Sequence, residues 1–270
     1  WSNNPGLGAL PVSEVHADQH GLAFSSSSRM IFGNDGGVYF SNDGSSTIVP
    51  RNKGYNTVQF YTLGVAPTTA FDGQDYFVAG AQDNGSHLVS NGTEGINSSD
   101  EVFGGDGAAS FFDQDGTDKY YVVNYVYNNS IELFNIETNS PVIINSENAQ
   151  NGDFINQEEL DSNLDILYSN YSDGGNFIIR RYSNIKTTTT IVDLTNDLMN
   201  SSPTALKISP FTTSSSKLFL GLRNGKILKV EDANGDSSTW SEITGGNFLG
   251  TVSDIEFGIN EQEIFVTMHN

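Results

Sequence analysis

Short runs of β-branched and aromatic residues, separated by Gly, Asn, Asp and Ser, follow one another along the whole chain. No window of about a dozen residues has the i, i+3, i+4 apolar spacing of an amphipathic helix. The best helical candidate, residues 156–164, is short and mostly polar. Because β-branched and aromatic runs bounded by turn residues are typical of strands, the pattern predicts an all-β fold.

One strand pattern, a charged residue followed by three apolar ones, recurs six times. The copies begin at Arg29, Asp75, Lys119, Asp165, Lys217 and Glu263, with spacings of 46, 44, 46, 52 and 46 residues. An apolar stretch precedes each copy, and a turn of Asn, Asp, Gly or Ser leads from the first five into another strand. Four antiparallel strands at this period are typical of a β-propeller blade, whereas a β-sandwich has no reason to repeat one strand so regularly.

The repeat predicts a propeller of four-stranded antiparallel blades, about five of them complete and a sixth partial. The expected blades are 16–50, 57–104, 107–146, 154–195, 203–245 and 251–270, all in one domain. The sixth unit has room for only two strands, and the first residues resemble the last strand of another blade. We therefore expect the sequence to be a piece of a larger propeller.

Charge and composition restrict the possible partners. The 270 residues include 12 Lys and Arg but 33 Asp and Glu, which gives a formal net charge of −21. This charge opposes nucleic-acid binding, and no apolar run is long enough to span a membrane. Cysteine is absent, which excludes a disulfide framework, a thiolate nucleophile and iron–sulfur or Cys-ligated zinc centres. No cofactor is expected, and such acidity suits the salty surroundings of a marine source.

Two segments resemble the Asp-box, Ser-x-Asp-x-Gly-x-Thr-Trp, which joins the third and fourth strands of some propeller blades. Residues 41–48 match its Ser, Asp and Thr, and residues 233–240 match it more loosely. Through them the chain resembles BNR/Asp-box propellers, found in sortilin-type receptors, sialidases, xyloglucanases and secreted Bacteroidetes proteins. In that family the box is a structural motif, in which a carboxylate accepts backbone N–H groups.

A second resemblance concerns large secreted BNR-repeat proteins described as glycosyl hydrolases, many of them flavobacterial. It rests on five segments in order, which are 16–20, 33–39, 54–61, 80–85 and 104–107. The resemblance implies a secreted or bacterial cell-surface protein. It also implies that the remaining blades, or a C-terminal sorting domain, belong to a longer chain.

Propeller geometry is expected to bring several polar motifs to one rim. Turns between the second and third strands share a rim with the junctions between blades, and the Asp-boxes occupy the other rim. The candidate ligand-binding residues on the shared rim are His16, Asp18, His20, Asn34, Asp35, Gln82, Asp83, Asn84 and Asp106. Asn and Asp next to Gly are also the residues that tight turns favour for conformational reasons alone. The candidate Asn and Asp residues in the turns could therefore have a purely structural role.

Two motifs could involve a cation. If the chain is extended there, His16, Asp18 and His20 face one side of a strand and could bind a ligand, hold a metal, or bond the backbone of neighbouring turns. The loop 113–118 has the Asp spacing of a calcium loop, but Asn124 stands where an EF-hand has its bidentate Glu. A solvated turn is therefore the favoured interpretation of this loop, and no metal site is assigned.

Two functional classes fit these observations. The favoured one is a secreted or cell-surface propeller that binds a polysaccharide or a protein. The alternative is a fragment of a xyloglucanase-like glycoside hydrolase, whose paired aspartates must lie about 5–9.5 Å apart. A sialidase is disfavoured because the five arginines are scattered along the chain. Whether the protein is an enzyme stays open, and no catalytic residue is assigned.

The net charge of −21 predicts that salt stabilises the fold. Like charges repel one another more in the compact state, and dissolved ions screen that repulsion. We expect Tm, measured by calorimetry, to rise between low salt and about 0.5 M NaCl. A flat or falling Tm would contradict this expectation.

Overall fold

The computed structural model describes residues 15–54, 58–138, 140–246 and 248–270. In these residues the backbone forms strands, turns and bends, and no helix is long and apolar enough to cross a membrane. The described strands form six antiparallel sheets, five of four strands and one of two. The prediction of an all-β propeller with about five complete blades and a partial one is confirmed.

Within every sheet the strands pair in the order in which they occur along the chain. The first sheet contains β1 (Gln19–Phe24), β2 (Met30–Asn34), β3 (Gly37–Ser41) and β4 (Val49–Pro50). The second contains β5 (Thr62–Val65), β6 (Asp75–Ala81), β7 (Gly85–Gly92) and β8 (Asp100–Phe103). The third contains β9 (Ser110–Phe112), β10 (Tyr120–Val126), β11 (Asn129–Asn135) and β12 (Pro141–Asn145).

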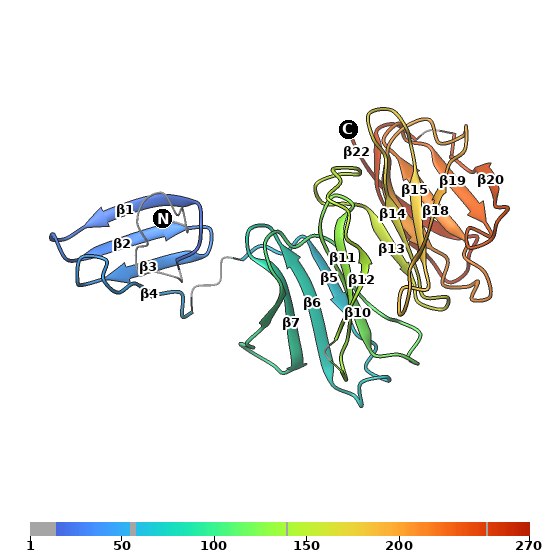
Figure 1. Cartoon of the computed structure of the whole chain (residues 1–270). Helices are drawn as coiled ribbons and strands as arrows, with labels where there is room; N and C mark the ends of the chain where they lie inside the picture. The colour runs from blue at the N-terminus through green and yellow to red at the C-terminus, as the bar shows by residue number, and fades with distance from the viewer. Residues whose placement is uncertain (1–14, 55–57, 139, 247) are drawn as a thin grey trace.

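The second half of the chain continues the same arrangement, as the yellow to red ribbons of Figure 1 show. The fourth sheet contains β13 (Glu158–Asp161), β14 (Ile166–Asn170), β15 (Ile179–Ser183) and β16 (Thr190–Leu194). The fifth contains β17 (Pro203–Ile208), β18 (Leu218–Leu222), β19 (Ile227–Glu231) and β20 (Thr239–Glu242). The sixth contains β21 (Thr251–Phe257) and β22 (Ile264–His269).

The six charged-then-apolar repeats are the second strands of the six sheets, β2, β6, β10, β14, β18 and β22. Elsewhere the structure differs from the pattern by a few residues. The fourth blade was expected to begin at residue 154, but its first strand begins at Glu158. The reason is that the buried Asn156 side chain accepts a hydrogen bond from the Asp153 amide at 3.1 Å and donates to the Asn170 carbonyl at 2.9 Å, which holds the chain in a turn there.

The core consists of apolar layers between neighbouring sheets. Successive side chains of a strand point to opposite faces, so Tyr120 and Val122 of β10 pack toward the fourth sheet while Tyr121 and Val123 pack toward the second. All four are at most 1% exposed. Burying one large apolar side chain contributes about 1.5–3 kcal/mol. This two-sided burial explains why the repeated strands are continuously apolar rather than alternating.

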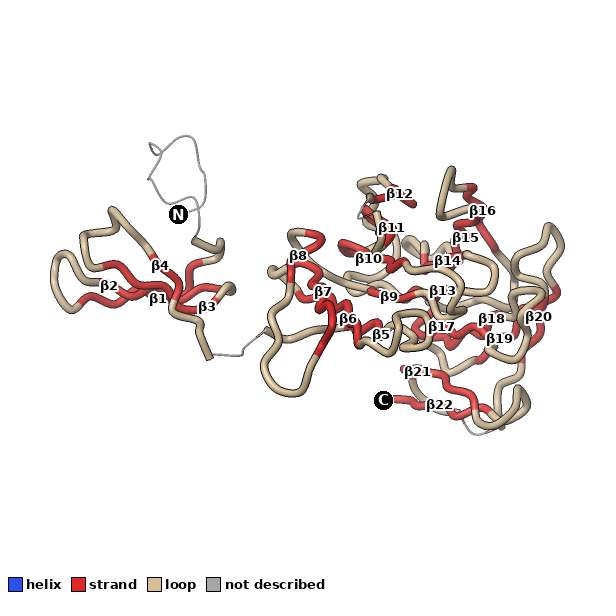
Figure 2. The backbone as a smooth tube through the Cα atoms, turned by 90° about the horizontal axis from the view of Figure 1, so that it is seen from below, coloured by secondary structure: helices blue, strands red, loops and turns tan. Residues whose placement is uncertain are grey.

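The first sheet is a partial exception to this packing. It lies apart from the other sheets in both views (Figures 1 and 2). Met30, Phe32 and Tyr39 form a small core on one of its faces. Leu22 and Phe24, which belong to β1, are 46% and 62% exposed. In the described part of the chain, no buried apolar cluster joins the first sheet to the second.

The second and third sheets meet closely where their backbones bond. The Gly107 amide donates to the Ala81 carbonyl at 2.8 Å, and the Gly85 amide donates to the Gly105 carbonyl at 2.7 Å. A Cβ atom on Gly107 would lie 2.3 Å from the Gly85 carbonyl oxygen, so only glycine allows this approach. The glycines of segments 80–85 and 104–107 therefore serve the contact between blades.

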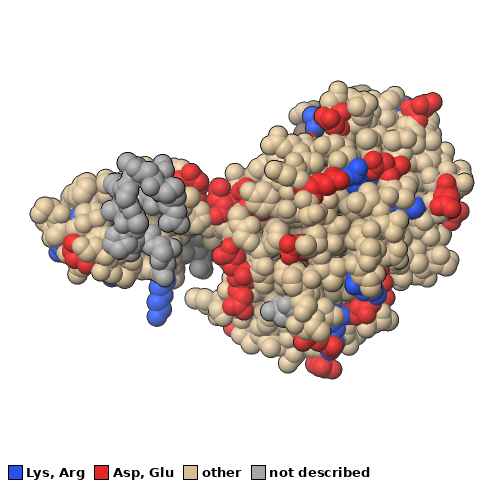
Figure 3. Space-filling view, viewed as in Figure 1, with Lys and Arg blue, Asp and Glu red and all other residues tan. Residues whose placement is uncertain are grey.

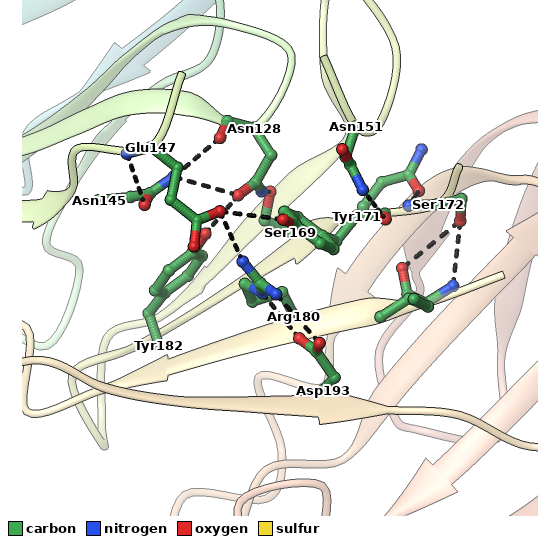
Figure 4. A network of polar contacts seen from close by, with 12 residues as sticks. Asn128, Asn145, Glu147, Asn151, Ser169, Tyr171, Ser172, Arg180, Tyr182 and Asp193 are labelled. Carbon is green, nitrogen blue, oxygen red and sulfur yellow. Dashed lines mark hydrogen bonds and ion pairs between the residues drawn. The ribbon is translucent and has the colours of Figure 1, made fainter. Parts of the chain in front are cut away.

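A layer of buried polar side chains lies between the third and fourth sheets (Figure 4). Asn128 donates to the Ser169 hydroxyl and accepts from the Tyr182 hydroxyl. Ser169 in turn donates to Glu158 at 2.7 Å. Because buried polar groups without partners cost free energy, this connected set fixes how the two sheets meet.

Arg180 anchors the edge of the same layer. Its guanidinium makes paired bonds of 2.7 and 3.0 Å to Asp193 on the neighbouring strand β16. It also donates at 2.9 Å to Glu147, in the connection from the third sheet to the fourth. The Arg180 guanidinium lies 3.3 Å from the centre of the Tyr171 ring, which adds a cation–π contact.

Glu158 makes stability depend on pH. Burial raises the pKa of its carboxyl group from 4.5 to about 8. The folded state thus keeps a proton that the unfolded chain loses above pH 4.5, and stability falls as the pH rises from about 5 to 8.

We expect Glu158→Gln to raise Tm at pH 8 by about 5 °C or more and to change it little at pH 4. The exposed control Glu94→Gln should leave Tm unchanged at both, and an equal pH response in Glu158→Gln and wild type would refute this role.

Candidate functional site

Two turns and one junction segment meet where the first sheet adjoins the second. The turns connect β2 to β3 and β6 to β7, and the junction segment precedes β1. Asn84 donates from its side chain to the Asp35 carbonyl at 3.3 Å. The His16 ring bonds the Asp83 carbonyl, 67 residues further along the chain. These polar bonds attach the first sheet to the second.

The position of His16 is set by three neighbours. Its carbonyl accepts hydrogen bonds from the side chains of Gln19 at 2.6 Å and Asn34 at 3.2 Å. A Cβ atom on Gly36 would lie 2.5 Å from the His16 Cβ, so glycine is required for the imidazole to pack over this turn. Asn34 also accepts from the Gly36 amide at 3.0 Å, which shapes the turn itself.

Segment 16–20 is not extended throughout, so the condition under which His16, Asp18 and His20 would share one strand face is not met. Asp18 has a φ of 56°, a left-handed conformation that Asp tolerates better than most residues, and β1 begins only at Gln19. The two histidines diverge as a result. His16 bonds Asp83, whereas the exposed His20 side chain contacts the Asp35 carboxylate.

Carboxylates from both sheets converge at this junction. One carboxylate oxygen each of Asp18, Asp35 and Asp83 lies within 4.8 Å of the others. Asp106 is linked to this cluster because its carboxylate accepts a hydrogen bond from the Asp83 amide at 3.0 Å. Partial burial first, and then the negative charges of Asp106, Asp35 and Asp18, raise the pKa of Asp83. Figure 3 shows acidic side chains gathered where the first sheet meets the rest of the chain.

A depression of about 510 Å³ opens beside these carboxylates. Five of the nine candidate residues line it, namely His16, Asp18, Asp83, Asn84 and Asp106. The other four, His20, Asn34, Asp35 and Gln82, lie outside its lining. The exposed Gln82 side chain accepts a hydrogen bond from the Tyr61 hydroxyl at 2.7 Å. The three clustered carboxylates are hard oxygen ligands, but nothing beyond their proximity points to an ion.

The depression has aromatic and acidic lining residues that the sequence did not single out. They are Tyr39, His87, Glu101 and Tyr125. His87 bonds the Asn84 carbonyl at 2.6 Å through one ring nitrogen and the Ser99 hydroxyl at 3.1 Å through the other. Burial, followed by the negative charge of Asp106, raises the pKa of Tyr125. Tyr39 and Tyr125 lie in strands, where an aromatic residue in the sequence indicates the core. Their polar hydroxyl groups were the one sequence feature that could have indicated a position on the rim.

The turn from β3 to β4 lies at the other end of the first sheet. Asp43 accepts hydrogen bonds from the Thr47 amide at 2.9 Å and from the Ser41 hydroxyl at 2.9 Å. These bonds, led by that from Thr47, lower the pKa of the exposed Asp43. In segment 233–240, Trp240 packs against the core between the fourth and fifth sheets.

The loop 113–118 is only partly the solvated turn that we expected. Asp115 and Thr117 form an exposed turn, in which Asp115 accepts the Thr117 amide at 2.7 Å and its hydroxyl at 2.8 Å. Asp113, in contrast, is 1% exposed. Burial, and then the neighbouring Asp115 and Asp165, raise the pKa of Asp113 to about 7. The loop packs on the fourth sheet, which the sequence did not show.

No protein-family model matches the chain, and a comparison with curated proteins also finds no match. Among solved structures, the chain is similar to the computationally designed Ika8 protein, at 17% identity over 91% of this chain and 67% of that one, with a TM-score of 0.50. It is also similar to an ancestral GH74 enzyme, at 16% identity over 83% of this chain, with a TM-score of 0.50.

The chain spans 32% of the length of that GH74 structure. At 16% and 17% identity the two likenesses concern the fold alone. The likeness to the GH74 structure agrees with the sheet order in describing a β-propeller, and both likenesses leave the chemistry of the depression to be argued from its own residues.

Proposed function

We propose that the chain is part of a secreted or cell-surface propeller that binds a polysaccharide in the depression between the first two sheets. The observation that carries this proposal is the convergence of Asp18, Asp83 and Asp106 on one depression together with the partly exposed Tyr125. Carboxylates accept strong hydrogen bonds from hydroxyl groups. Aromatic faces pack against the apolar C–H faces of sugar rings.

The charge of the site narrows the glycan class. Four aspartates meet there, and the net charge of the chain is −21. A uronic-acid or sulfated polysaccharide would be repelled. The proposed ligand is therefore a neutral polysaccharide, such as a β-glucan or a xyloglucan. Secretion is supported by the resemblance to secreted BNR-repeat proteins.

We also propose that residues 41–48 form an Asp-box. The Asp43 carboxylate accepts the Thr47 amide, and the Ser45 amide donates to the Ser41 hydroxyl at 2.9 Å, as a structural box requires. Ile48 packs against the core of the first sheet, in the place that tryptophan occupies in the full pattern. The box supports the first sheet from the end opposite the depression.

A glycoside hydrolase is the second candidate function. The proximity of three carboxylates and the raised pKa of Asp83 favour it, because a general acid must keep its proton near neutral pH. The fold is shared with a GH74 enzyme. Against it, three oxygens within 4.8 Å of one another form one cluster, whereas hydrolysis needs two carboxyls on either side of a glycosidic bond.

Titration calorimetry with soluble β-glucan and xyloglucan oligosaccharides tests binding. We expect Asp18→Asn to weaken affinity about tenfold, because a hydrogen bond to a charged group is worth about 1.5–3 kcal/mol. Tyr125→Ala should weaken it similarly by removing a ring face. Asp236→Asn, an exposed aspartate of the fifth sheet, is the matched control. Equal affinity in all four proteins, or an absence of binding to either glycan, would contradict the proposal.

A reducing-end assay on the same glycans separates the two functions. Binding without product release identifies a binding module. Product release that Asp83→Asn abolishes, while affinity is retained, identifies the hydrolase. In that case Asp83 is the candidate acid, because burial and the neighbouring carboxylates raise its pKa.

A further inference from the structure

In the described part of the chain, Asp113 is a buried carboxylate with no hydrogen-bond donor from outside its own loop. It follows β9 at the end of the third sheet away from the depression and is 1% exposed. Neither of its carboxylate oxygens has a hydrogen-bond partner among the described residues. Its backbone is held by a 3.1 Å bond from its amide to the Tyr120 carbonyl. A carboxylate in such surroundings is costly unless a proton or a cation neutralises it.

The equivalent position of the next sheet does have a partner. Asp161, at the end of β13, lies opposite Ile166 as Asp113 lies opposite Tyr120, and it accepts a hydrogen bond from the Ser216 hydroxyl at 2.5 Å. Ser216 comes from the following sheet and precedes the charged residue of its repeat, and in the fourth sheet that place is taken by Leu164. Since the leucine side chain has no donor, the contact that Asp161 makes is missing at Asp113.

Other carboxylates surround this position, and the nearby ammonium group is already engaged. Lys186 lies 2.6 Å from Asp118 and 2.6 Å from Asp165. Asp165 also accepts the Tyr120 hydroxyl at 2.8 Å. Lys186 pairs with these two aspartates and with neither Asp113 nor Asp115, which leaves an excess of negative charge beside Asp113.

The loop is anchored by hydrogen bonds. The Gln114 amide donates to the Ser162 hydroxyl at 2.9 Å, which fixes the loop to the fourth sheet. Thr117 holds the Asp115 carboxylate beside the backbone, and Gly116 turns the chain with a φ of 77°. Asp113 and Asp115 are two residues apart across this anchored turn, and the charge of Asp115 acts directly on Asp113.

We propose that the loop 113–118 binds a calcium ion through the carboxylates of Asp113 and Asp115. The donors are all oxygen atoms, and the turn is irregular and partly open to solvent. Ca²⁺ accepts six to eight oxygens in flexible geometry and can take the rest from water, whereas Mg²⁺ demands a near-ideal octahedron. The ion neutralises the buried charge and strengthens the contact between the third and fourth sheets. This site is independent of the depression and of its ligand.

The test is the melting temperature of the whole chain after EDTA treatment, with and without CaCl₂ at constant ionic strength. We expect calcium to raise Tm of the wild type by about 5 °C, because a ligand that binds only the folded state stabilises it by mass action. Asp113→Asn should abolish the rise and, since it removes a buried charge, should still fold. Asp115→Asn, at an exposed position, should weaken calcium affinity at least tenfold in titration calorimetry.

Asp83→Asn is the matched control, because it removes a carboxylate from the other acidic cluster. It should keep the full calcium response. A wild-type Tm that calcium leaves unchanged would overturn the proposal and show that a proton alone neutralises Asp113. A response that survives Asp113→Asn but is lost in Asp83→Asn would also overturn it and would place the ion between the first two sheets.

Discussion

The packing of each sheet against its neighbours on both faces is the constraint on which the rest of the structure depends. It requires apolar side chains on both sides of the second and third strands, as in β10, β14 and β18. The antiparallel order of the strands places the described inter-blade junctions and second-to-third turns at one end of the sheets. The depression lies at that end, and the loop 113–118 lies at the other. Both follow from the order of strands within each sheet.

Apolar packing alone does not fix how two sheets are arranged, and polar contacts between the sheets select one arrangement. Between the third and fourth sheets, the buried bonds of Asn128, Ser169 and Glu158 define one arrangement of the two surfaces. Between the first two sheets, polar bonds replace the apolar layer, and His16 and Asn84 make them. A contact built from polar groups leaves carboxylates and rings accessible. The place where packing is weakest is therefore the place where we propose that a ligand binds.

The sequence predicted the fold well because its signals are local. A charged residue followed by three apolar ones, with a turn of Asn, Asp, Gly or Ser after it, specifies a strand and its hairpin without reference to the rest of the chain. The site was predicted only as a group of loops. The bond from His16 to Asp83 spans 67 residues, and the bend at Asp18 depends on tertiary contacts. Tyr125 and the burial of Asp113 were missed for the same reason, since only packing between sheets determines them.

The account claims that apolar layers bind the later sheets together, whereas the first sheet is held mainly by the polar contacts at the depression. Hydrogen–deuterium exchange of the backbone amides measures this most directly, because it reports the free energy of opening for each segment. The account predicts that amides of β10, β14 and β18 exchange most slowly and that those of β1, β2 and β3 exchange orders of magnitude faster. Equal protection of the first sheet and the fourth would contradict it.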